Sequence, residues 1–244
     1  MSPCKAIFRR EFASYFNTPL AGVFLVIFLL LAGIFTFQMG GFFERGQADL
    51  RPFFQFHPWL FLFLVPAIAM RLWAEERRQG TIEVLMTLPI KMRDLVVGKF
   101  LAAWAFTITA LLLTTPIWWT ASYLGDPDHG VILTSYIGSA LMAGGYLAIG
   151  SCISALTKNQ VIAFVLSVVI CFIFLLSGFP MVLEFFSGWA PEFIVEAIAS
   201  LSFLTHFQSL SRGVIDLRDV LYFFAVIATF LYLNGLILDW KKAA

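Results

Sequence analysis

Long uninterrupted apolar runs constrain this chain more than any other sequence feature. They occupy residues 20–42, 56–74, 98–124, 131–156, 160–183 and 219–239. A helix of about 20 apolar residues matches the thickness of the hydrocarbon core of a bilayer. The runs are continuous rather than alternating, which argues against a transmembrane β-barrel. The sequence therefore predicts an all-α integral membrane protein with six transmembrane helices.

The composition agrees with this class. Of the 244 residues, 60% are hydrophobic and 13% are charged, against about 45–50% and about 25% in soluble domains. The six runs and their connections account for the length, so we expect one transmembrane domain over residues 1–244. The net charge of +1 provides no basic field for phosphate, so we expect no nucleic-acid partner. The three cysteines lack metal-ligand spacing, so we expect no metal site.

The basic residues are unevenly distributed over the predicted connections. With the N-terminus inside, 12 of the 16 lie on the inner side: Lys5, Arg9, Arg10, Arg71, Arg77, Arg78, Lys91, Arg93, Lys99, Lys158, Lys241 and Lys242. The outer side keeps Arg45, Arg51, Arg212 and Arg218. Because basic residues favour the cytoplasmic side, both termini are predicted to be cytoplasmic, in a bacterial inner membrane.

An amphipathic helix is predicted over residues 2–18, before the first span. Phe8 and Phe12 fall on one stripe, whereas Arg9 and Arg10 lie off it. Such a helix rests in the membrane interface, with lipid on its apolar side. It is either an anchor only or an anchor that also contacts a cytoplasmic partner.

A short helix is predicted within the cytoplasmic segment 75–97. Gly80 ends the preceding helix, and Thr81 is able to cap a new one. Glu83 suits the positive end of the helix dipole, and Pro89 marks the end of the helix.

The apolar residues of this short helix require a surface. Ile82, Leu85 and Met86 repeat at helical spacing. A helix of about two turns is not stable alone in water. The segment therefore lies on the membrane or docks into another protein.

Residues 75–102, EERRQGTIEVLMTLPIKMRDLVVGKFLA, carry a family resemblance. They resemble the segment between the second and third helices of ABC type-2 exporter permeases, with an acidic-basic stretch, Gly-Thr-x-Glu-x-Leu, a later proline and a Gly-Lys pair. The whole plan is similar to that family, and most similar to the compact gliding-motility and copper-assembly permeases.

The resemblance implies a function and site residues. The chain would be the permease subunit of an ATP-driven exporter, and residues 80–89 would be its coupling helix, docked in a groove of a cytoplasmic ABC ATPase subunit. Coupling would involve Glu75, Glu76, Gly80, Thr81, Ile82, Glu83, Leu85, Met86 and Pro89. A second permease, identical or homologous, would complete the path. The interface or path would include Phe24, Phe28, Phe35, Phe172 and Phe174.

ATP chemistry is expected on a separate chain. A phosphate-binding loop requires G-x-x-x-x-G-K-[ST], and the sequence around Gly98 and Lys99 does not fit it. We therefore expect no cofactor and no enzyme activity in this chain, with ATP and Mg²⁺ bound by the partner ATPase. The alternative is a membrane subunit that passes ATPase-driven motion to an envelope machine without moving a substrate.

An external segment is predicted over residues 184–218. Residues 178–180 are expected to break the fifth span, and two short amphipathic pieces follow, separated by Gly188 and Pro191. Permeases of the family often have two half-helices before the last span. The segment lies in the outer interface of the membrane, re-enters the outer leaflet, or packs on the bundle as a cap.

Two other classes of membrane protein fit the sequence poorly. His57, Arg71 and Lys99 lie at the ends of runs, which argues against proton- or ion-driven transport. An intramembrane hydrolase would need Ser151 or Ser177 as nucleophile and a base such as His206. His206 has no carboxylate neighbour in sequence to orient it.

Overall fold

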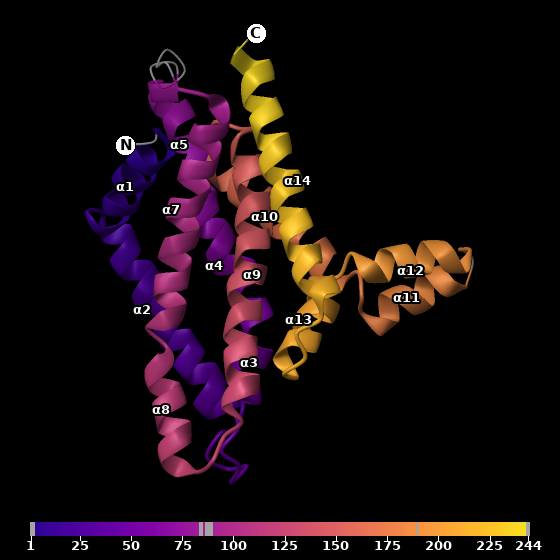
Figure 1. The fold of residues 1–244 in the computed structure, drawn as a ribbon. Helices are drawn as coiled ribbons and strands as arrows, with labels where there is room; N and C mark the ends of the chain where they lie inside the picture. The colour runs from indigo at the N-terminus through magenta and orange to yellow at the C-terminus, as the bar shows by residue number, and fades with distance from the viewer. Residues whose placement is uncertain (1–2, 83–84, 86–89, 189, 243–244) are drawn as a thin grey trace.

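The computed structural model describes residues 3–82, 85, 90–188 and 190–242, which form a helical bundle (Figure 1). The described ends of the chain lie together at one end of the bundle, which we call the termini end. The connections at residues 40–50 and 125–128 lie at the other end, which we call the opposite end.

Five helical stretches among the described residues are long and apolar enough to cross a membrane. They are α2 (Pro19–Ile34) with the π-helix η1 (Phe35–Met39), α4 (His57–Ala69) with α5 (Arg71–Gln79), α7 (Met92–Leu112) with α8 (Thr115–Leu124), α9 (His129–Ser154), and α14 (Leu217–Lys242). The two short helices α1 (Pro3–Phe16) and α3 (Arg51–Gln55) precede α2 and α4.

Two bent helix pairs complete the bundle. α10 (Gln160–Leu176) meets α11 (Pro180–Ser187) at 74°, and α12 (Glu192–Ser200) meets α13 (Phe203–Ser211) at 61°. If each bent pair is one span, the candidate spans number up to seven. The structure thus gives five to seven candidate spans, a range that contains the predicted six.

Helix α9 forms the centre of the bundle. In the most apolar 18-residue stretch of α9, 83% of the residues are buried inside the bundle. The corresponding share is 22% both for Ala21–Met39 and for α14. Its small residues admit close neighbours, because a Cβ at Gly150 would lie 2.5 Å from Ala69 Cβ of α4. A Cβ at Gly144 would lie 3.0 Å from Trp104 Nε1 of α7. The glycines of α9 therefore serve packing within the chain.

The helices on both sides of residue 80 extend beyond the predicted spans 56–74 and 98–124. The predicted cytoplasmic segment 75–97 overlaps α5, which continues to Gln79, and α7, which begins at Met92. Glu75 Oε1 accepts hydrogen bonds from Arg78 Nη2 at 3.1 Å and from Gln79 Nε2 at 2.5 Å. Hydrogen bonds and ion pairs between side chains one turn apart stabilise a polar helix, so α5 continues beyond the apolar run.

The fifth apolar run breaks where the sequence predicted. α10 ends at Leu176 and α11 begins at Pro180. A Cβ at Gly178 would lie 2.5 Å from Ser202 Oγ, so this turn presses against the start of α13. Glycine is the residue that fits there.

The short helices α11 and α12 project sideways from the bundle (Figure 1). Neither helix has a buried residue among those described. Phe185 and Phe193 are exposed by 69% and 70%. A cap that packs on the bundle therefore does not describe α11 and α12, whereas α13, in the second half of the predicted segment 184–218, packs on the bundle through Phe203, Phe207 and Leu210. The exposed rings of α11 and α12 need lipid or another chain to cover them.

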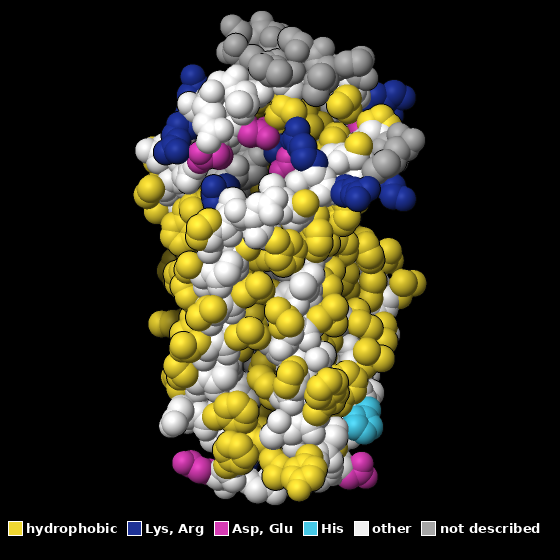
Figure 2. Space-filling view, turned by 90° about the vertical axis from the view of Figure 1, so that its left-hand side faces the viewer, with side chains coloured by type: hydrophobic (Ala, Val, Ile, Leu, Met, Phe, Trp, Pro, Cys, Tyr) yellow, Lys and Arg dark blue, Asp and Glu magenta, His cyan; other side chains and the backbone are white. Residues whose placement is uncertain are grey.

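The surface shows an apolar band between two polar ends (Figure 2). In this view Lys and Arg lie at the termini end together with some acidic side chains, whereas the opposite end shows acidic side chains and a histidine. Exposed apolar residues also cover one side of α10: Val161, Ile162, Val165, Leu166, Val169, Phe172 and Ile173. The band has the character of a surface in contact with hydrocarbon.

Candidate functional site

Residues 80–82 follow α5 at the termini end and, with Leu85, are the described part of the predicted coupling helix. Thr81, Ile82 and Leu85 have helical backbone. The other predicted coupling residues of this helix, Glu83, Met86 and Pro89, lie outside the described residues. Their roles remain predictions.

Gly80 turns the chain from α5 into this segment. Its φ of +72° lies in the left-handed region, which favours glycine. A Cβ at this position would have no heavy atom within 4 Å, so backbone conformation alone accounts for the glycine. Gly80 therefore ends α5 as the sequence predicted.

The apolar residues of the segment rest partly on their own bundle. Ile82 and Leu85 are half-buried and pack against the core. Thr81 is exposed, and its hydroxyl donates a hydrogen bond to the Glu76 carbonyl at 3.3 Å. Of the described residues in this segment, Ile82 and Leu85 thus rest on the bundle and Thr81 is exposed.

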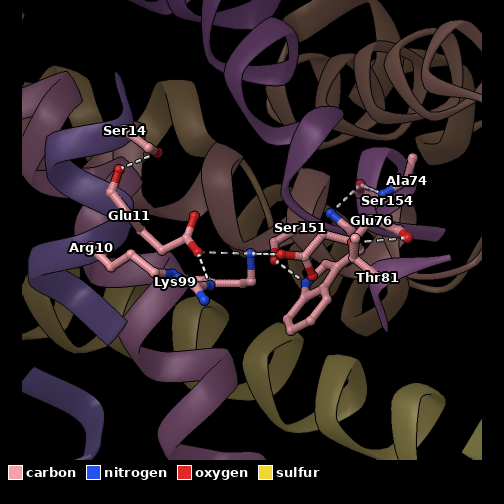
Figure 3. A network of polar contacts seen from close by, with 10 residues as sticks. Arg10, Glu11, Ser14, Ala74, Glu76, Thr81, Lys99, Ser151 and Ser154 are labelled. Carbon is pink, nitrogen blue, oxygen red and sulfur yellow. Dashed lines mark hydrogen bonds and ion pairs between the residues drawn. The ribbon is translucent and has the colours of Figure 1, made fainter. Parts of the chain in front are cut away.

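A buried ion cluster lies next to this segment (Figure 3). Lys99 Nζ of α7 lies 2.6 Å from Glu76 Oε1 of α5 and 3.3 Å from Glu11 Oε1 of α1. Lys99 is only 2% exposed. One ammonium group therefore joins three helices at the termini end.

The charges of this cluster are balanced by four groups. Arg10 Nη2 donates to Glu11 Oε1 at 2.5 Å, so two cations face two carboxylates. Burial alone would raise the pKa of Glu11, but Lys99 and Arg10 outweigh it and lower that pKa. Glu11 thus remains ionised. Glu76 Oε2 is buried and has no hydrogen-bond partner in the described part of the chain.

Trp73 connects the ion cluster to α9 and α14. Lys99 Nζ lies 5.3 Å from the centroid of the buried Trp73 ring, within the range of a cation–π interaction. Ser151 Oγ of α9 accepts hydrogen bonds from Trp73 Nε1 at 3.2 Å and from Asn234 Nδ2 of α14 at 2.7 Å. Three helices therefore meet at one hydroxyl group.

Ser154 holds the junction between α4 and α5. Its hydroxyl donates to the Met70 carbonyl at 2.8 Å and accepts from the backbone N–H groups of Trp73 at 3.1 Å and Ala74 at 3.0 Å. Backbone groups at a helix junction need such partners when they are buried. The serine attaches α5 to α9. We use the name coupling network for Glu11, Trp73, Glu76, Lys99, Ser151, Ser154 and Asn234.

Sequence reasoning identified one member of the coupling network, Glu76, as a coupling residue, and it named Lys99 and Ser151 only in other contexts. The signal for Glu11 was its place on the stripe Ile7, Glu11 and Tyr15, which has helical spacing and packs toward α7. A Cβ at Gly98 would lie 2.9 Å from Ile7 Cγ2, so α1 packs closely on α7 beside Lys99.

The predicted interfacial residues lie on the other sides of α1. Phe8 and Phe12 are half-buried and stack with ring centroids 5.7 Å apart. Arg9 and Arg10 are exposed, as expected for a polar side that faces headgroups or water. Glu75, the remaining predicted coupling residue, pairs with Arg78 on α5.

Four of the five aromatic residues predicted at an interface or path pack within the chain. Phe24 and Phe28 are 7% and 1% exposed. Phe35 and Phe174 pack against other aromatic rings of the bundle. Phe172 is 39% exposed on α10. The structure therefore places four of the rings in packing contacts within the chain and one on its surface, and their role at an interface or path stays a prediction.

The structure gives two of the histidines polar partners from other helices. His57 is at the end of an apolar run but is fully buried, with Nδ1 2.8 Å from Ser139 Oγ. His206 has a carboxylate partner after all, because its Nδ1 lies 2.6 Å from Asp219 Oδ1. The two residues lie 13 positions apart on different helices and meet because α13 packs on α14, so their pairing was not evident from the sequence.

The two serines considered as nucleophiles have partners elsewhere. Ser151 accepts hydrogen bonds within the coupling network. Ser177 Oγ donates to the Phe174 carbonyl at 3.1 Å. Neither hydrogen-bonds to His206 in the described structure, so the nucleophile and base of a hydrolase are not brought together there.

Comparison with known proteins places this arrangement in a family. No curated protein matches the sequence. A family model described as ABC-2 family transporter protein matches residues 6–238, which include every member of the coupling network. The family consists of membrane permease subunits, which in general work with an ABC ATPase and assemble as dimers. The chain therefore belongs to the ABC-2 transporter family.

Proposed function

We propose that this chain is the permease subunit of an exporter, and that it couples ATP hydrolysis by a separate ABC ATPase subunit to movement of a substrate across the inner membrane. Family membership supports the permease role in general. The observation that carries the coupling role is the coupling network, which links the segment after Gly80 to five helices.

The contacts indicate how force would pass through the protein. Docking of an ATPase on residues 80–89 would displace the end of α5. Lys99 connects that end to α1 and α7, while Ser154 and Ser151 connect it to α9 and α14. Because these contacts are buried and short, α5 would move its neighbours with it rather than bend alone.

The alternative function is transmission of ATPase-driven motion to an envelope machine. The observation that favours it is the pair α11 and α12, which projects from the bundle with no buried residue. Such a pair offers a surface to an external partner. The coupling network serves this function equally well, because both functions begin with motion of the ATPase. They differ in whether that motion moves a substrate or an external partner.

The ATPase assignment is tested by co-expression with the ABC ATPase encoded nearest to this chain. We expect the two proteins to copurify from detergent-solubilised membranes. The isolated chain is expected to show no ATP hydrolysis, because its sequence has no phosphate-binding loop. Hydrolysis of ATP by the isolated chain, or failure of every co-expressed ABC ATPase to copurify, would contradict the proposal.

The proposed topology has both termini in the cytoplasm. Single cysteines are introduced after replacement of the native Cys4, Cys152 and Cys171 by alanine. We expect an impermeant maleimide to label positions 47, 126 and 192 in intact spheroplasts, and to label 78 and 158 only after the membrane is opened. The exposed basic residues at the termini end are the reason for this expectation. The reverse pattern at 126 and 158 would invert the topology.

A further inference from the structure

A cavity lies between α3 and α13 toward the opposite end. It measures about 410 Å³, which is the volume of a small ligand site. Arg51 and Gln55 line it from α3, whereas Gln208 lines it from α13 and Arg212 from the residue that follows. Two aromatic side chains, Phe54 and Phe207, also line it.

The lining is divided into a polar rim and an apolar floor. Arg51, Gln55, Gln208 and Arg212 are exposed. Phe54 and Phe207 are 3% and 2% exposed, so they form the inner wall. A ligand that fits such a lining has an anionic head and an apolar body, because guanidinium groups bind oxyanions and aromatic rings bind apolar surface.

Neither guanidinium group is held by a strong ion pair. Arg212 has no ion pair in the described part of the chain. Arg51 Nε lies 3.9 Å from Asp49 Oδ2, and the Arg51 side chain is 74% exposed, so this pair is weak. Asp49 and Asp128 line a smaller neighbouring cavity of about 140 Å³ and do not line this one.

The distribution of charge also singles out this cavity. Only four basic residues are predicted on the outer side of the membrane, namely Arg45, Arg51, Arg212 and Arg218. Two of the four line one cavity with an apolar floor. The Phe54 ring packs edge-on against Tyr136 of α9 at 5.1 Å, so packing with the central helix already fixes the floor. A preformed site loses less entropy on binding.

We infer that this cavity binds an anionic amphiphile, with its head group on Arg51 and Arg212 and its apolar body on Phe54 and Phe207. A membrane lipid and a free amphiphile share this chemistry. The inference goes beyond the proposed function, because binding requires neither the ATPase nor transport.

The test uses the purified chain in phosphatidylcholine nanodiscs, with dodecyl phosphate as the probe and empty nanodiscs as background. We expect saturable binding to the wild type. The double variant Arg51→Gln/Arg212→Gln should bind at least tenfold more weakly, because it loses both charged contacts. The matched control Arg45→Gln/Arg218→Gln removes the same charge outside the cavity and should stay within twofold. Unchanged thermal unfolding shows that both variants are folded.

Three further arms test the head, the body and the source of the ligand. Inorganic phosphate and dodecyl maltoside should each bind at least tenfold more weakly than dodecyl phosphate. If phosphatidylglycerol in the nanodisc competes with dodecyl phosphate, the occupant is a membrane lipid. If it does not compete, the occupant is a free amphiphile in the same site. Equal losses in the two double variants, or equal binding of phosphate or maltoside, would overturn the inference.

Discussion

Replacement of Lys99 by methionine is expected to lower the thermal stability of the purified chain by several kcal/mol. The variant keeps a side chain of similar length but leaves Glu11 and Glu76 without their common ammonium group. Removing one partner of a buried charged cluster costs about 3–5 kcal/mol. For a chain of this size, about 2–4 °C per kcal/mol gives a fall of roughly 6–20 °C in Tm.

Two further variants define the cause of that fall. Lys158→Met removes a lysine from an exposed position, and surface changes of this kind stay within about 0.5 kcal/mol. The triple variant Lys99→Met/Glu11→Gln/Glu76→Gln removes the uncompensated carboxylates and should regain most of the lost stability. A Lys99→Met protein with wild-type Tm, or a triple variant as unstable as the single one, would contradict the role given to the cluster.

The triple variant also separates stability from coupling. It should fold, because its buried groups are neutral, but it lacks the ionic link between α1, α5 and α7. If that link transmits motion, the variant permease should change the rate of ATP hydrolysis by the assembled complex less than the wild-type permease does. The coupling network would then be more than a packing device.

Local signals in the sequence were sufficient for the course of the chain. Gly80 and Pro180 mark helix boundaries because their effect on the backbone requires no distant partner. The apolar runs identify the spans for the same reason. Hydropathy contains no information on bending, however, so the pairs at 74° and 61° leave five to seven candidate spans where the sequence predicted six.

Distant contacts were beyond sequence reasoning. Lys99 was assigned to the end of a span, where lysine side chains usually reach water. It is buried because α1 folds back onto α7 and brings Glu11 to it. His206 shows the same difficulty, since its partner Asp219 belongs to another helix. The family resemblance indicated Glu76 as a coupling residue, whereas it included Lys99 only as the lysine of the Gly-Lys pair and gave no sign that the two side chains meet.

The segment after Gly80 is either a docking element for an ATPase or a helix that rests on lipid, and Leu85 distinguishes these possibilities. Both place its side chain in an apolar contact, and half of it is already against the core. Leu85→Asp puts an unpaired carboxylate into that contact, at a cost of a few kcal/mol. For a protein interface this corresponds to about 10²-fold in affinity.

The matched control for Leu85→Asp is Ile90→Asp. Ile90 is also half-buried against the core at the termini end, but it lies outside residues 80–89. If the segment docks, Leu85→Asp should reach the membrane in normal amounts and lose copurification with the ATPase, while Ile90→Asp keeps it. Equal losses of membrane yield in both variants would indicate a folding defect and reject the docking contact. Unchanged copurification in Leu85→Asp would identify the segment as a membrane anchor, because a buried carboxylate within a protein groove cannot be silent.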